Sequence, residues 1–64
     1  MNDADKLRMF LPHWIEHNGE HAEEFRAWAE RVAMVRESLM AAAELLEEAN
    51  QRLRDAMERL PPGG

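Results

Sequence analysis

The chain has 64 residues, a net charge of −5 and no cysteine. It is long enough for one small domain, which hides only about 60% of its unfolded surface when it folds alone. Because disulfides are excluded, we expect a bound metal or oligomerisation to supply part of its stability. The sequence has no basic block, which argues against nucleic acid as a partner, and no long apolar run or signal peptide, so we expect a cytoplasmic protein with no membrane insertion.

The first predicted element is a helix from about Asp3 to about Ala33. Asn2 or Asp3 can cap its first turn. Pro12 lacks a backbone donor, so we expect a kink there rather than a break. Gly19 weakens a helix, but the apolar residues keep one helical phase across it. These residues are Trp14, His21, Phe25 and Trp28.

Apolar residues follow a seven-residue repeat, which is typical of helices that pack side by side. One seam position of this repeat holds Leu11, Phe25, Val32, Leu39, Leu46, Leu53 and Leu60. The other holds Leu7, Trp14, Trp28, Val35, Ala42, Ala49 and Ala56.

The repeat runs through residues 33–38 without Gly or Pro, which is compatible with one long coiled-coil helix. A turn near Met34–Ser38 would instead produce two helices of comparable length, each with an apolar face, and two such hairpins make a four-helix bundle. We favour the hairpin: an all-α domain over residues 1–60 that forms a homo-oligomeric helical bundle. Residues 61–64 are predicted to be a disordered tail.

Three histidines, the only ones in the chain, recur every four residues at His13, His17 and His21. One helical turn separates neighbours, so their imidazoles line one ridge. On a helical wheel His21 lies on the apolar face, His17 at its edge, and His13 and Glu24 at its rim. Imidazole suits Zn, Ni, Co, Cu or Fe, and a carboxylate can complete the shell. We therefore predict a transition-metal site formed by His13, His17, His21 and Glu24, with the metal unidentified.

In a hairpin, His21 is predicted to lie opposite Ala49–Asn50. Glu47 and Asn50 are then candidates for a further ligand, or for side chains that orient the imidazoles. The alternative interpretation is structural: His21 and Asn18 form a polar layer that fixes the register and the choice of partner.

The stretch from His13 to Glu30 reads His-Trp-Ile-Glu-His-Asn-Gly-Glu-His-Ala-Glu-Glu-Phe-Arg-Ala-Trp-Ala-Glu. Together with Ala-Glu-Leu-Leu-Glu-Glu-Ala-Asn at 43–50, it resembles a family of short, mostly uncharacterised prokaryotic helical proteins. The shared pattern is His-Trp-Ile-Glu-His-Asn, two residues, then His-Ala-Glu-Glu-Phe. The resemblance implies no established activity. It does imply one shared site or core that contains His13, Trp14, His17, Asn18 and His21.

Catalytic motifs are absent from the sequence. There is no Gly-rich phosphate loop, no cysteine nucleophile and no His-Glu-x-x-His, and Ser38 is the only serine. We therefore predict a non-enzymatic protein that binds a transition metal for storage, sensing or delivery. The alternative is an oligomerisation or interaction module whose partner is itself. A third, weaker hypothesis is a metal-dependent enzyme whose site forms only between subunits.

Overall fold

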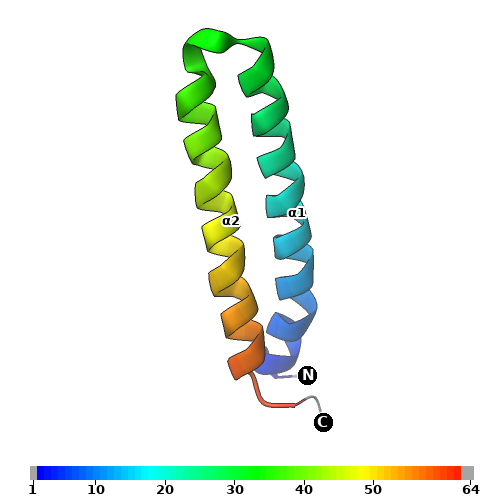
Figure 1. Ribbon diagram of the computed structural model, residues 1–64. Coiled ribbons are helices and arrows are strands. Elements are labelled where there is room, and N and C mark those ends of the chain that lie inside the picture. The colour runs from blue at the N-terminus through cyan, green and yellow to red at the C-terminus, as the bar shows by residue number, and fades with distance from the viewer. Residues whose placement is uncertain (1, 63–64) are drawn as a thin grey trace.

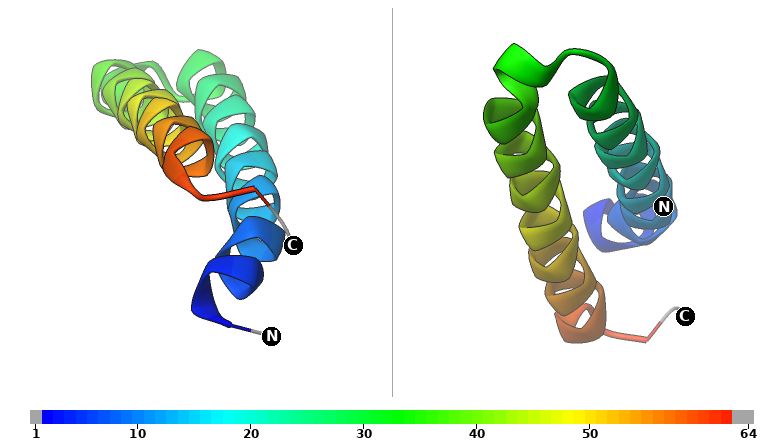
Figure 2. Two further views of the ribbon diagram at one scale, coloured as in Figure 1. Left: turned by 90° about the horizontal axis from the view of Figure 1, so that it is seen from below. Right: turned by 45° about the horizontal axis from the view of Figure 1, so that its top comes forward.

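The computed structural model describes residues 2–62, which form two antiparallel helices joined by a tight turn (Figure 1). Helix α1 spans Asp3–Arg31, a short 3-10 helix, η1, spans Ala33–Val35, and α2 spans Arg36–Arg59. The all-α hairpin is confirmed, and the alternative of one long helix is wrong because the chain reverses at the turn. Figure 2 shows the same pair from two further directions, with no other described element covering either long side.

Helix α1 begins where the sequence predicts. The Asn2 side-chain oxygen accepts a hydrogen bond from the Asp5 backbone N–H at 2.9 Å, which satisfies a free donor of the first turn. Asp3 and Asp5 add negative charge at the positive end of the helix dipole. The helix continues through Pro12 and Gly19 without a break. Its first turns are bent relative to the rest of the helix (Figures 1 and 2), as expected for a helix that contains a proline.

The turn comes slightly earlier than the predicted Met34–Ser38. Val32 leaves the helical conformation with φ −125° and ψ 87°, and the Val35 N–H donates to the Val32 carbonyl at 3.1 Å. No side chain caps α2, and Ser38 lies inside its first turn. The Arg36 guanidinium also bridges the turn, with Nη2 2.9 Å from the Glu30 Oε1 atom. The reversal is made by backbone hydrogen bonds and this exposed ion pair, which is why neither a glycine nor a capping residue marks it in the sequence.

The contact between the helices is made by small residues. The buried apolar side chains are Leu11, Ala22, Ala29 and Ala43. Three of these four are alanines, so the two helices can approach closely. The contact differs from the predicted seam, because Trp14 and Trp28 are exposed. At about 100° per residue, the contact face of α1 is turned roughly a quarter of the way round the helix from the predicted apolar face.

The end of α2 lies beside the start of α1. Arg8 donates from Nε to the Pro61 carbonyl at 2.9 Å, so the first residue of the predicted disordered tail is bound to α1. The last part of that tail, Gly63 and Gly64, lies outside the described residues. Among residues 2–62, neither helix is long and apolar enough to cross a membrane.

Candidate interaction face and histidine ridge

The three histidines form a ladder on the solvent side of α1. All three side chains are exposed. The ring centroids of His13 and His17 are 4.4 Å apart, and those of His17 and His21 are 6.5 Å apart. Phe25 continues the ladder at 6.3 Å from His21. The ridge predicted from four-residue spacing is therefore present, but it faces solvent rather than α2.

The predicted metal ligands do not converge on one point. Among the described residues, no three His, Cys, Asp or Glu side chains are placed to hold an ion together. Glu24 is exposed on the same helix. His13 and His17 form the closest pair of imidazoles. The four-ligand set therefore stays a prediction that would require side-chain movement or ligands from outside the chain.

A polar layer does form inside the hairpin, and it consists of asparagines. Asn50 is only 5% exposed and donates from Nδ2 to the Ile15 carbonyl at 3.0 Å. Its Oδ1 accepts from Asn18 Nδ2, also at 3.0 Å. Because each of these Asn50 atoms has a partner, the buried amide does not carry the cost of an unmade hydrogen bond. Asn50 is thus already engaged and does not orient an imidazole, and His21 lies outside this layer.

Glu47, the other residue predicted to ligate the metal or orient an imidazole, lies on the opposite side of the hairpin. Its Oε1 lies 2.5 Å from Arg26 Nη2. This ion pair borders a groove between the helices, which we call the polar groove. Its lining residues are Glu16, Gly19, Glu20, Ala22, Glu23, Arg26, Glu47, Asn50, Gln51 and Arg54.

Large aromatic side chains gather on the side of α1 that carries the histidines. Phe10 stacks on Trp14 with ring centroids 5.7 Å apart, and the Arg31 guanidinium lies 4.8 Å from the Trp28 ring centroid. Trp14 is 44% exposed and Trp28 is 51% exposed. Residues of one helix that follow one another at three-, four- or seven-residue spacing lie on one side of it. We call this set the aromatic face: Phe10, Trp14, His17, His21, Trp28 and Val32.

Helix α2 has a matching row of apolar residues, which we call the aliphatic stripe. None of its members is fully buried against α1. The members are Ala42, Leu46, Ala49, Leu53, Ala56 and Leu60. By helical phase, the aromatic face and the aliphatic stripe each lie on the side of their own helix away from the polar groove. Both therefore face the same, opposite side of the hairpin.

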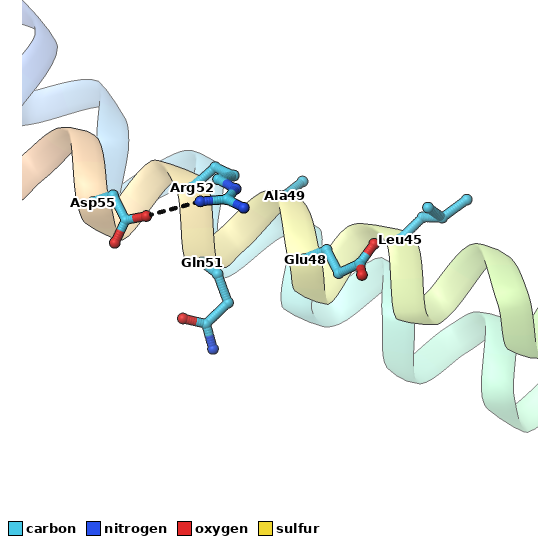
Figure 3. Close-up of a pocket in the computed structure, with 6 residues that line it drawn as sticks. All are labelled: Leu45, Glu48, Ala49, Gln51, Arg52 and Asp55. Atoms are coloured by element: carbon cyan, nitrogen blue, oxygen red, sulfur yellow. Dashed lines mark hydrogen bonds and ion pairs between the residues drawn. The ribbon is translucent and has the colours of Figure 1, made fainter.

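A second hollow lies on α2 alone. Figure 3 shows its six lining residues, which all come from this one helix, and the Arg52 to Asp55 ion pair of 3.5 Å at one end. Leu45 and Ala49 are its only apolar walls. A single helix cannot enclose a bound molecule, so we regard this hollow as surface relief between side chains.

The chain matches a protein-family model over residues 7–60, and that model is described as a domain of unknown function, DUF8180. The chain belongs to this family. The match spans both helices, the turn, the aromatic face and the histidine ridge, so the prediction that the chain belongs to an uncharacterised family is confirmed. The histidine-containing signature itself stays a prediction. No curated protein and no solved structure matches the DUF8180 chain significantly.

Proposed function

We propose that this hairpin is an oligomerisation module that pairs with a second copy of itself through the aromatic face and the aliphatic stripe. The observation that carries the proposal is the half-exposed state of Trp14 and Trp28. Tryptophan carries more apolar area than most side chains, and exposed apolar patches rimmed by polar residues mark protein contacts. No element among residues 2–62 packs over the exposed part of these two side chains.

The shape of the chain supports the proposal. Its accessible surface is 5092 Å². A compact monomer of 7.4 kDa would expose about 4,200 Å², so the hairpin exposes about 900 Å² more than that. Each partner in a standard protein interface buries about 800 Å². The radius of gyration of 15.0 Å also exceeds the roughly 11 Å of a compact domain of this length. The excess area is thus sufficient for one ordinary interface.

The arrangement of the apolar residues favours another helical pair as the partner. The aromatic face and the aliphatic stripe run along two neighbouring helices on one side. A second hairpin laid on that side would complete a four-helix bundle, the usual way in which such pairs bury their remaining apolar residues. The histidines His17 and His21 would lie within this interface.

The solution mass tests the proposal. We expect light scattering after gel filtration to give a dimer or larger for the natural chain, and a monomer for Trp28→Glu, because buried tryptophans commonly contribute about 2 kcal/mol or more to binding. Met34→Glu is the matched control. Met34 is 90% exposed in the connection between the helices, so this variant should keep the natural mass. A monomeric natural chain, or an unchanged mass for Trp28→Glu, would contradict the proposal.

A further inference from the structure

His13 and His17 stand apart from the third histidine in both distance and position. Their ring centroids are 4.4 Å apart, the shortest ring separation on the ridge. Both side chains are exposed on the same helix. By helical phase His13 lies at the rim of the aromatic face, whereas His21 lies near its centre. A second copy on the face would therefore cover His17 and leave His13 at its edge.

We propose that His13 and His17 form a two-histidine site for a divalent transition-metal ion such as Zn²⁺, Ni²⁺ or Cu²⁺, with water in the remaining coordination positions. Two histidines at this spacing present their rings on one face of a helix, the arrangement that zinc motifs on helices use. A metal–nitrogen bond of about 2.1 Å places the ion roughly 3.2 Å from each ring centre. Two centres 4.4 Å apart can share an ion at that reach.

The same ion-to-ring distance excludes His21 as a third ligand in the observed arrangement of the rings. Two reaches of roughly 3.2 Å span about 6.4 Å, and the His17 and His21 centroids are 6.5 Å apart. In this arrangement an ion bound to one of these two rings therefore does not reach the other. His21 also neighbours Phe25 in the ladder, at 6.3 Å. The proposed site thus uses two of the four ligands predicted from the sequence, and it leaves out His21 and Glu24.

The metal site goes beyond self-association and does not depend on it. Both ligands come from one helix of one chain, so a monomeric hairpin should bind the ion without a partner. Trp28 lies about four helical turns from His13. Trp28→Glu should therefore keep metal binding while it loses association, and the two proposals can fail separately.

Calorimetric titration of Ni²⁺ and Zn²⁺ into the untagged, chelator-treated full chain tests the site. We expect one ion per chain. His13→Ala and His17→Ala should each weaken binding by at least about tenfold, and His21→Ala, the matched control on the same ridge, by less than about threefold. All three side chains are exposed, so circular dichroism should show unchanged helix content. Absence of measurable binding by the natural chain would overturn the site, as would a loss for His21→Ala equal to or greater than that for His13→Ala.

Discussion

One long side of the hairpin carries the aromatic face and the aliphatic stripe, and the other carries the polar groove. The groove is lined by charged side chains that partly neutralise one another, such as Arg26 and Glu47. The opposite side exposes two tryptophans. The same two helices thus form one side suited to water and one suited to another protein surface. Amphipathic helices need not bury their most apolar face against the nearest helix in their own chain.

The distinction between the two sides depends on the rotation of α1 relative to α2. A rotation of α1 about its axis would bring its two tryptophans toward α2 and turn the charged residues of the polar groove toward the outside. Asn50 opposes such a rotation, because its side chain reaches both Asn18 and the Ile15 carbonyl. Three substitutions test the two sides, from the largest expected effect to the smallest.

Asn50→Ala should destabilise the hairpin most. The substitution removes both hydrogen bonds and leaves the half-buried Asn18 amide without its partner, which costs about 1–3 kcal/mol. Urea unfolding at one protein concentration measures the change. Gln51→Ala is the matched control, since it truncates an exposed amide one residue later and should change stability by less than about 0.5 kcal/mol. Equal effects of the two variants would show that the asparagine layer does not hold the two sides apart.

Gly19→Ala should stabilise the chain. A Cβ at this position would meet nothing within 4 Å, and its backbone does not have a positive φ. Because alanine is the better helix former, we expect a gain of about 0.5–1 kcal/mol in the free energy of unfolding. Ala27→Gly, an exposed position on the same helix, should produce a loss of similar size. Destabilisation by Gly19→Ala would mean that a partner approaches the polar groove closely, and the two sides would then be less different than their side chains indicate.

Glu47→Gln should have the smallest effect. The Arg26 to Glu47 pair measures 2.5 Å, but the two side chains are 34% and 56% exposed, so water screens it. We expect a loss below about 1 kcal/mol that shrinks further in concentrated salt. Glu48→Gln, a neighbouring exposed acid, provides the comparison in a thermal unfolding series. A loss well above that of Glu48→Gln at high salt would indicate that the polar groove contributes more than screened surface charge.

Local features of the sequence were predicted well. The helical period identified both helices, Asn2 supplied the expected cap, and four-residue spacing placed the histidines on one ridge. These features depend on contacts within one or two turns of a helix, which the order of residues specifies directly. The position of the turn was less accurate, since a reversal held by backbone hydrogen bonds and one exposed ion pair leaves no marker such as glycine or a capping side chain.

The sequence by itself determined that this protein is helical, that each helix has a wide apolar stripe, and that the histidines form a ridge running from the rim of that stripe onto it. Only the tertiary structure decided which part of each stripe the hairpin buries. A single neighbouring helix can cover only part of a wide stripe, and the covered part is where alanines permit close approach and where Asn18 and Asn50 satisfy each other. That choice depends on pairs of residues far apart in the chain, and its consequence is that Trp14, Trp28 and the histidines face outward.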